Sequence, residues 1–463
     1  MAQIDIWLRI IEQERIIIFG TLLALAFTGL LFGNRRASRS LHRRGVVVIC
    51  GRRGKYKTAP RFRWRRDMVS VAGVEIPRLD ETKHFKLIGT TGTGKSTAIR
   101  GLLAGAIARG DRAVIADPDG GYLTRFYDRY RGDVILNPFE INSVKWDWFA
   151  ELQKPYDVEQ LATSLIPASE DAATQEWRGY SRAFFTAVAR RCMRVGCADS
   201  AELWRLLTVA SAEELRPIVA GTPAQPFLDP DNARMFGSIR SVAGSAVASL
   251  EHIQAQRTAL FSIRSWVRKG GTSALFIPYK AGQIAALRTM IAAWMRLAIF
   301  ETMGGKEEQD QRLWFIVDEL DALGAIDGLK DALARLRKFG GRCVLGFQSI
   351  AQVSTTYGAG NAQTIVENCG NTLILRCSGS ENGGTSRFAS QLIGEREVIR
   401  RQTSRGRDRE GFFGARGFRR STNISEQTAT ETAVMPSEIE QLPDLQGYLK
   451  LVSSQSWLKV SLR

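Results

Sequence analysis

Runs of mostly apolar residues recur along the chain, and most of them end in, or just before, a glycine, an acidic residue or a polar amide. They lie at residues 85–88, 112–117, 134–138, 274–279, 313–319, 343–349 and 371–377. Helix-length segments such as 97–108 and 283–300 lie between several of them. Buried strands that alternate with helices are typical of a parallel sheet with crossover helices. The pattern therefore predicts an α/β domain.

The segment from residue 155 to residue 262 has a different pattern, with few strand-like runs and many helix-forming residues. Trp177, Tyr180, Phe184 and Val188 recur there at helical spacing. We expect an all-α domain inserted into the α/β domain. Its aromatic side chains either form its core, which is the plainer interpretation, or stack on nucleic-acid bases.

One apolar run near the start of the chain is long enough to cross a membrane. Ile16 to Phe32 carries no charge and is about 17 residues long, at the lower end of the spanning range. A cleaved signal peptide is disfavoured, because Glu12 and Glu14 precede the run and no small-residue cleavage site follows it. Arginines follow the run at once, so the sequence predicts a single retained transmembrane helix with the rest of the chain cytoplasmic.

The formal net charge of +17 comes from two basic segments. Residues 35–66 hold thirteen Lys or Arg and no acidic residue, and residues 400–420 hold eight Arg and two acidic residues. The first segment is either a stop-transfer signal that touches anionic lipid or an additional DNA contact. The second is expected to be a mobile loop that contacts the DNA backbone or is simply solvated. Six cysteines without a C-x-x-C pair and only three histidines argue against zinc and iron–sulfur sites.

The strongest motif is Gly89 to Ser96, GTTGTGKS, which fits the phosphate-binding loop G-x-x-x-x-G-K-[ST] between a predicted strand and a predicted helix. Its glycines let backbone N–H groups surround phosphates. Lys95 is expected to reach the β- and γ-phosphates, and the Ser96 hydroxyl to bind Mg²⁺. The expected ATP-binding residues are Gly89, Thr90, Thr91, Gly92, Thr93, Gly94, Lys95, Ser96 and Thr97.

The run from Leu313 to Val317 ends in Asp318 and Glu319, as a Walker B strand does. Such a strand brings acidic groups to the sheet edge beside the phosphates. We expect Asp318 to hold Mg²⁺ and Glu319 to act as the general base toward the attacking water. Gln348 ends the next apolar run, where it either senses the γ-phosphate or caps the following helix. The predicted catalytic residues are Glu319, Lys95 and Gln348.

These patterns predict an α/β chain with a RecA-like P-loop nucleotide-binding domain, an inserted all-α domain and one N-terminal transmembrane helix. We expect the anchor and its basic flank at residues 1–45, and the first part of the nucleotide-binding domain with its P-loop at 46–154. The all-α domain is expected at 155–262, and the second part of the nucleotide-binding domain at 263–463.

The chain resembles the TraD/TrwB-type coupling proteins of conjugative type IV secretion systems. The likeness is carried by Val71 to Arg78 before the P-loop, by the P-loop itself, by Gly110 to Pro118, by Ile135 to Pro138, by Phe261 to Trp266, by Arg312 to Leu320, by Gly346 to Gln352 and by Met435 to Asp444. It covers most of residues 70–450.

The resemblance implies an ATP- and Mg²⁺-dependent hexameric ring in the bacterial inner membrane. Such a ring pumps single-stranded DNA, bound to a relaxase, toward the secretion channel. A trans-acting arginine is implied as well, with Arg376 and Arg387 as candidates.

One departure from the family is that only a single span is found where two are usual. Two other functions stay open. One is a double-stranded DNA translocase of the FtsK/HerA kind, and the other is a membrane platform that recruits relaxosome or effector proteins without acting as a motor.

Overall fold

The computed structural model describes residues 41–50, 68–169, 171–196, 199–307, 311–380, 383–410 and 417–462. These residues belong to two compact units. The larger unit comprises Val47–Ile393 and Val434–Arg463, and the smaller one the described residues up to Val46 together with Gly394–Ala433. The predicted anchor, Ile16 to Phe32, lies outside the described residues. Within the described ranges, no helix is both long and apolar enough to cross a membrane.

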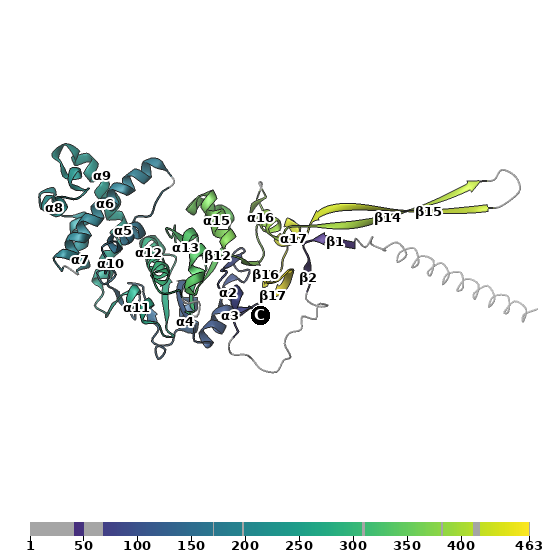
Figure 1. Cartoon of the computed structure of the whole chain (residues 1–463), viewed down its shortest axis with the longest axis horizontal. Helices are drawn as coiled ribbons and strands as arrows, with labels where there is room; N and C mark the ends of the chain where they lie inside the picture. The colour runs from purple at the N-terminus through teal and green to yellow at the C-terminus, as the bar shows by residue number, and fades with distance from the viewer. Residues whose placement is uncertain are drawn as a thin grey trace, which may run out of the picture. The chain divides into compact units, whose positions relative to one another are not determined.

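Ten of the described strands form one mixed sheet in the larger unit (Figure 1). In spatial order they are β2 (Val48–Cys50), β17 (Trp457–Ser461), β16 (Gln446–Lys450), β13 (Asn371–Ile374), β5 (Phe85–Ile88), β12 (Gly341–Phe347), β11 (Leu313–Val317), β6 (Arg112–Pro118), β10 (Ala274–Tyr279) and β7 (Val134–Ile135). The strands from β13 to β7 are parallel, whereas β16 is antiparallel to both β13 and β17. The predicted α/β architecture is confirmed, and the predicted parallel sheet is extended at one edge by the antiparallel β16.

The centre of this sheet is buried on both faces, which explains why its strands are apolar at nearly every position. In β11, Trp314 and Ile316 join a core cluster that also contains Ile99 and Leu103 of the helix after the P-loop. The alternate residues of β11, including Phe315, are equally buried although they point to the opposite face. Helices on both faces therefore fix β11 and the acidic residues that follow it.

The helices of the larger unit come close to the predicted bounds where these were given, since the expected segments 97–108 and 283–300 correspond to α3 and α12. The helices are α2 (Arg78–Glu81), α3 (Lys95–Ala108), α4 (Gly121–Phe126), α5 (Asp157–Leu165), α6 (Ala172–Arg194), α7 (Ser200–Thr208), α8 (Ala212–Val219), α9 (Ala233–Val247), α10 (Leu250–Ala255), α11 (Ile263–Lys269), α12 (Ile284–Met303), α13 (Leu329–Leu336), α14 (Ile350–Tyr357), α15 (Ala359–Asn368), α16 (Gly384–Ile393) and α17 (Pro436–Glu440). Two short two-stranded pairings, β3 (Ser70–Val71) with β4 (Val74–Glu75) and β8 (Lys145–Trp146) with β9 (Leu260–Phe261), complete the unit.

The described residues between β8 and β9 form only helical elements, α5 to α10 with two short 3₁₀ turns. Phe184 and Val188 of α6 are fully buried, as expected of core residues. Trp177 is different, because 36% of its surface is exposed while its ring contacts Tyr180 edge-on. The core interpretation therefore holds for the second half of the aromatic stripe and fails for Trp177.

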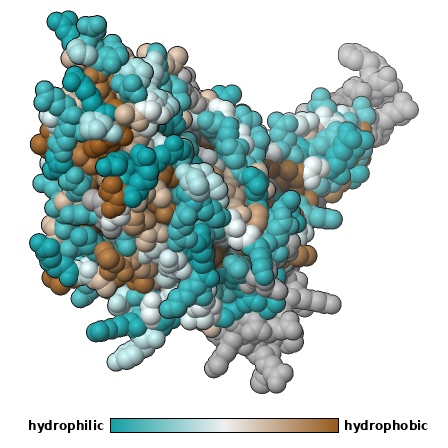
Figure 2. All heavy atoms as spheres, turned by 60° about the vertical axis from the view of Figure 1, so that its left-hand side comes forward, coloured by the Kyte–Doolittle hydropathy of each residue, from teal (hydrophilic) through white to brown (hydrophobic). Residues whose placement is uncertain are grey.

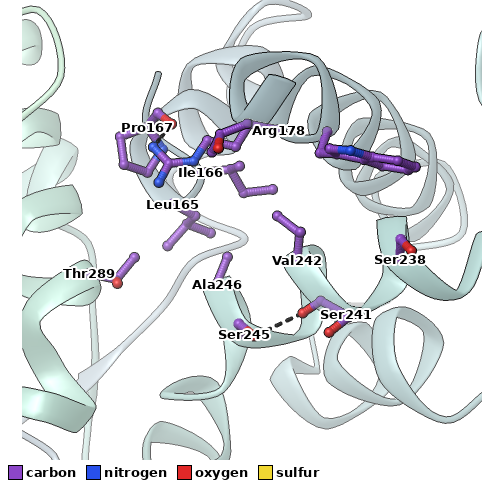
Figure 3. Close-up of a pocket in the computed structure, with 12 residues that line it drawn as sticks. Leu165, Ile166, Pro167, Arg178, Ser238, Ser241, Val242, Ser245, Ala246 and Thr289 are labelled. Carbon is purple, nitrogen blue, oxygen red and sulfur yellow. Dashed lines mark hydrogen bonds between the residues drawn. The ribbon is translucent and has the colours of Figure 1, made fainter. Parts of the chain in front are cut away.

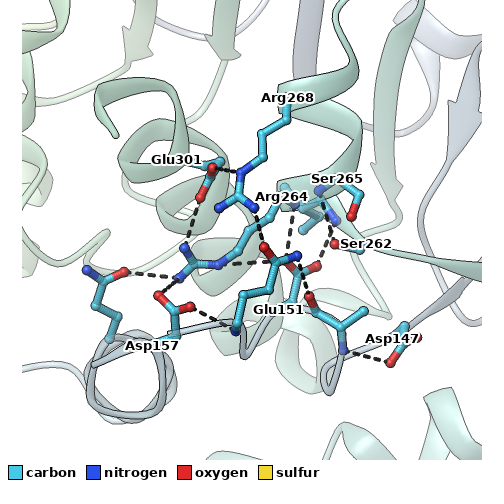
Figure 4. Close-up of polar contacts among 12 residues, drawn as sticks. Asp147, Glu151, Asp157, Ser262, Arg264, Ser265, Arg268 and Glu301 are labelled. Atoms are coloured by element: carbon cyan, nitrogen blue, oxygen red, sulfur yellow. Dashed lines mark hydrogen bonds and ion pairs between the residues drawn. The ribbon is translucent and has the colours of Figure 1, made fainter. Parts of the chain in front are cut away.

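A buried cluster of charges joins α5, the segment after β8, α11 and α12 (Figure 4). Arg264 of α11 forms ion pairs with Glu301 of α12 at 2.9 Å and with Asp157 of α5 at 3.1 Å. Glu151 accepts hydrogen bonds from the backbone N–H groups of Ile263 and Arg264 and from the Trp146 indole. Burial raises the pKa of Glu151 to about 7, against the opposing effect of these donors. Arg264 of the motif Phe261 to Trp266 thus has a structural role, because it links α11 to α5 and α12.

The smaller unit is a three-stranded antiparallel sheet of β1 (Leu41–Gly45), β14 (Glu395–Glu410) and β15 (Gly417–Thr432). The expectation of a loop at residues 400–420 is wrong, because the described residues of that segment pair across β14 and β15 from Arg400 with Gln427 to Glu410 with Gly417. Polar composition excludes a buried core, but it does not prevent a ladder of backbone hydrogen bonds.

Candidate nucleotide-binding site

The loop between β5 and α3 has the conformation that its glycines allow. Gly92 and Gly94 have φ angles of 78° and 113°, a region in which a side chain would be strained. A Cβ on Gly94 would also lie 2.8 Å from a methyl group of Leu445. Gly94 immediately precedes α3, so the loop presents the N-terminus of that helix, as a phosphate site requires.

Lys95 is buried at the start of α3 and donates to carbonyl oxygens of its own loop. Its Nζ lies 2.5 Å from the oxygen of Gly89 and 3.2 Å from that of Thr90. Burial lowers the pKa of Lys95, while the nearby carboxylates of Asp318 and Glu319 oppose this shift. The ammonium group is thus held in the loop by two weak acceptors, which an anionic ligand can replace.

Ser96 and Asp318 come together although 222 positions separate them in the sequence. The Ser96 hydroxyl donates to Oδ2 of Asp318 at 2.6 Å, and the buried Tyr122 hydroxyl donates to the same oxygen at 2.7 Å. The other oxygen of this carboxylate, Oδ1, is buried and has no hydrogen-bond partner among the described residues. Asp318 therefore keeps one oxygen available for a further ligand.

Glu319 and Gln348 form a second polar contact at the same sheet edge. The Gln348 amide donates to Oε1 of Glu319 at 3.3 Å and accepts from the Thr91 hydroxyl at 3.0 Å. The alternative role of Gln348 as a helix cap is wrong, because Ser349 caps α14 through the N–H of Ala351. Burial raises the pKa of Glu319, and Asp318 and Asp321 raise it further.

The turn after β6 adds residues that the sequence did not single out. Asp117 accepts hydrogen bonds from the N–H groups of Tyr122 and Leu123, and so holds the first turn of α4 in place. Burial raises the pKa of Asp117 to about 6. Tyr279, at the end of the neighbouring β10, has a buried hydroxyl without a partner among the described residues. The turn Asp-Pro-Asp-Gly-Gly before Tyr122 was the one sequence signal for this arrangement.

These residues surround a pocket of about 400 Å³. It is lined by Thr90, Thr91, Gly92, Gly94, Lys95, Ser96, Thr97, Arg100, Pro118, Asp119, Gly121, Tyr122, Asp318, Glu319, Gln348 and Leu445. All predicted site residues line it except Gly89 and Thr93. Thr93 is buried beneath the loop with its hydroxyl on the Thr90 carbonyl, and Gly89 supplies an acceptor for Lys95.

Most of the chain matches a known protein family. The family described as type IV secretion-system coupling protein DNA-binding domain matches residues 68–463. The chain belongs to this family. Coupling protein TraD of Escherichia coli (strain K12) is 30% identical over 405 residues, which cover 85% of this chain and 54% of TraD. The chain thus spans about half the length of that relative.

Solved structures of a coupling protein have the same fold. Plasmid coupling protein TrwB in complex with ADP and Mg²⁺ aligns with a TM-score of 0.78 at 32% identity, over 91% of this chain and 94% of TrwB. TrwB in complex with a non-hydrolysable ATP analogue gives the same values. The chain therefore has the fold of these coupling-protein structures.

The two arginines proposed to act in trans do not line the pocket of this coupling protein. Arg376 forms an ion pair with Asp444 at 2.6 Å, and its carbonyl accepts from the Thr90 N–H of the P-loop. Arg387 lies on α16 and folds over Gly383. Their catalytic roles stay predictions.

A larger hollow lies away from the P-loop, between the all-helical segment and α12 (Figure 3). Its volume is about 750 Å³, and Trp177, Arg178, Ser241, Ser245 and Thr289 are among the residues that line it. None of the predicted catalytic residues lies there. Figure 2 shows the mixed polar and apolar character of the surface on this side of the molecule.

Proposed function

We propose that this chain is a membrane-anchored ATPase that couples ATP hydrolysis to the movement of single-stranded, relaxase-bound DNA into a conjugative type IV secretion channel. The observation that carries the proposal is the contact between the Ser96 hydroxyl and Oδ2 of Asp318 at the mouth of the P-loop. It joins the two elements that bind a nucleotide and its metal in P-loop enzymes. Membership of the coupling-protein family and the nucleotide complexes of TrwB support the same activity.

The residues at this site fit a hard divalent cation. Oδ1 of Asp318 is buried and unpartnered in the described part of the chain, and the Ser96 oxygen lies beside the same carboxylate. Oxygen ligands of this kind suit Mg²⁺, which is usually held by one or two carboxylates and by phosphate oxygens. When bound, Mg²⁺ would neutralise charge that develops on the phosphates of ATP.

The remaining residues have distinct tasks in the proposed reaction. The Lys95 ammonium group gives up its hydrogen bonds to the carbonyl oxygens of the loop and binds the β- and γ-phosphates of ATP instead. Glu319 takes a proton from the attacking water, and its raised pKa brings its basicity closer to what neutral pH requires. Gln348 contacts both Glu319 and Thr91, so it is suited to sense the γ-phosphate and to report its loss.

The proposal includes assembly and location. We place Ile16 to Phe32 in the bacterial inner membrane with the later residues in the cytoplasm, because arginines follow the apolar run. We propose a hexameric ring in which a neighbour supplies an arginine to the γ-phosphate. The net charge of +17 supports a polyanionic partner, and the family description names DNA binding.

ATP turnover by the full chain, measured without DNA and with single-stranded or duplex DNA, tests the activity. We expect single-stranded DNA to stimulate turnover more than duplex DNA does, and turnover per chain to rise steeply with protein concentration if sites form between subunits. Stimulation mainly by duplex DNA would favour a double-stranded DNA translocase. Nucleotide binding without turnover would favour a recruiting platform. The Lys95→Ala chain serves as the inactive control.

A further inference from the structure

The smaller unit has a strand order that relates the basic hairpin to the start of the chain. β1 pairs with the base of β14, from Leu41 opposite Ile399 to Gly45 opposite Arg396. Because the pairing is antiparallel, the N-terminal end of β1 points along β14 toward its distal end. Leu41, where the described part of β1 begins, is therefore the residue of β1 nearest to residues 400–410.

Lengths along the chain show how far each part extends in that direction. The strand from Ile399 to Glu410 extends about 36 Å beyond the level of Leu41, at about 3.3 Å per residue. Eight residues lie between Phe32, the end of the apolar run, and Leu41. The nine Cα–Cα steps from Phe32 to Leu41 can span at most about 32 Å. The distal part of the hairpin is thus long enough to reach the level at which the apolar run ends.

The charges of the smaller unit change along the hairpin. At its base, Arg396 and Arg400 form ion pairs with Glu431, and Arg401 with Glu426. Farther out, residues 405–410 and 417–420 contain five arginines, at positions 405, 407, 409, 419 and 420, against the two acids Asp408 and Glu410. The distal part therefore carries an excess of positive charge with few acidic residues to balance it.

We infer that the distal part of the β14–β15 hairpin, residues 402–410 and 417–420, docks on the anionic surface of the membrane that holds the chain. Phosphate groups of anionic lipids attract clustered arginines close to a bilayer. DNA phosphates would attract the same charges, but the direction of β1 favours the membrane. The inference rests on the anchoring part of the proposed function and does not depend on ATP hydrolysis.

The test uses the full chain in lipid nanodiscs with a fluorescent label on one cysteine. Cys50 and Cys197 are first replaced by serine, and the label is placed at Ser404→Cys in one chain and at Thr430→Cys, near the hairpin base, in another. Lipids with a quencher in the headgroup region report proximity to the membrane. The nanodiscs contain either phosphatidylcholine alone or phosphatidylcholine mixed with phosphatidylglycerol.

We expect quenching at residue 404 to exceed that at residue 430 at least about twofold in anionic nanodiscs, and to weaken as salt rises. Changing Arg405, Arg407 and Arg409 to Gln should remove most of this difference. The matched control changes three exposed arginines of the helical segment, Arg191, Arg194 and Arg216, to Gln and should leave the difference in place.

Equal quenching at the two positions, or quenching that is independent of phosphatidylglycerol, would overturn the inference. So would a label at residue 404 that responds to single-stranded DNA and not to anionic lipid, because the arginines would then serve DNA. A chain that does not remain with the nanodiscs would overturn it together with the anchor. ATP turnover in the same samples keeps these failures distinct from a failure of the ATPase.

Discussion

The larger unit contains two clusters of buried charge that differ in whether their carboxylates form ion pairs with a cation among the described residues. Around Arg264, Glu151 accepts hydrogen bonds at both of its oxygens, and Glu301 and Asp157 form ion pairs with the guanidinium. Around Asp318, one carboxylate oxygen receives two hydroxyl donors and the other receives none from the described residues. Asp318 also lines the pocket beside the P-loop.

The difference separates a structural cluster from a ligand site. Buried charges are costly unless they are paired, so a closed cluster stabilises the arrangement of the elements that supply it. A buried carboxylate oxygen without a partner is energetically unfavourable, and a cation bound beside the P-loop would stabilise it. Substitutions in the first cluster should therefore act on stability, and those in the second on nucleotide chemistry.

The largest expected effect comes from Glu319→Gln. Loss of the general base should lower ATP turnover by about a hundredfold or more while ATP still binds. Steady-state turnover and equilibrium binding of a fluorescent ATP analogue measure the two properties. Lys95→Ala, in contrast, should weaken binding as well. Normal turnover by Glu319→Gln would show that the catalytic assignment is wrong.

Arg264→Met should break the structural cluster and leave the buried carboxylates of Glu151 and Asp157 without their cation. Removing one partner from such a cluster costs about 3–5 kcal/mol. The midpoint of thermal unfolding should fall by about four to six degrees. Arg268→Gln is the control, since Arg268 also pairs with Glu301 but is 42% exposed and should cost less than about 1 kcal/mol. Equal losses in the two variants would contradict the distinction.

Tyr122→Phe should act on the metal and not on the fold. The variant loses the hydrogen bond that orients Asp318, a contribution of about 1.5 kcal/mol. We expect the Mg²⁺ concentration for half-maximal turnover to rise about tenfold. Tyr127→Phe, at a partly exposed tyrosine outside the pocket, controls for loss of a hydroxyl. An unchanged Mg²⁺ requirement would remove Tyr122 from the site.

The smallest expected effect is a shift in pH dependence. Glu319 acts as a base only when it is ionised, and burial raises its pKa. As the pH is lowered, turnover should therefore start to fall at a higher pH than it would with an ordinary glutamate as the base. Asp321→Asn removes a neighbouring negative charge that raises this pKa. The acid limb of the turnover profile should then move to lower pH by less than about one unit. A shift to higher pH would contradict the assigned cause.

Much of the sheet could be predicted because its strands are buried on both faces and therefore read as apolar runs. The P-loop and the acids after β11 were predictable for the same reason, since each motif follows such a run. Tyr122 was not, because it belongs to neither motif and reaches Asp318 only through the turn that Asp117 holds between β6 and α4. The basic hairpin was mistaken for a loop, since its strands are held by backbone pairing that leaves no apolar pattern.

The most direct test of the central claim measures how ATP and Mg²⁺ raise the thermal midpoint of the full chain. A ligand that binds only the folded state raises this midpoint. We predict that ATP stabilises the wild-type chain and that Mg²⁺ adds a further increment. Asp318→Asn should lose that increment, whereas Arg264→Met, although less stable, should keep it. A full Mg²⁺ increment in Asp318→Asn would contradict the claim that Ser96 and Asp318 form the metal site of a nucleotide pocket.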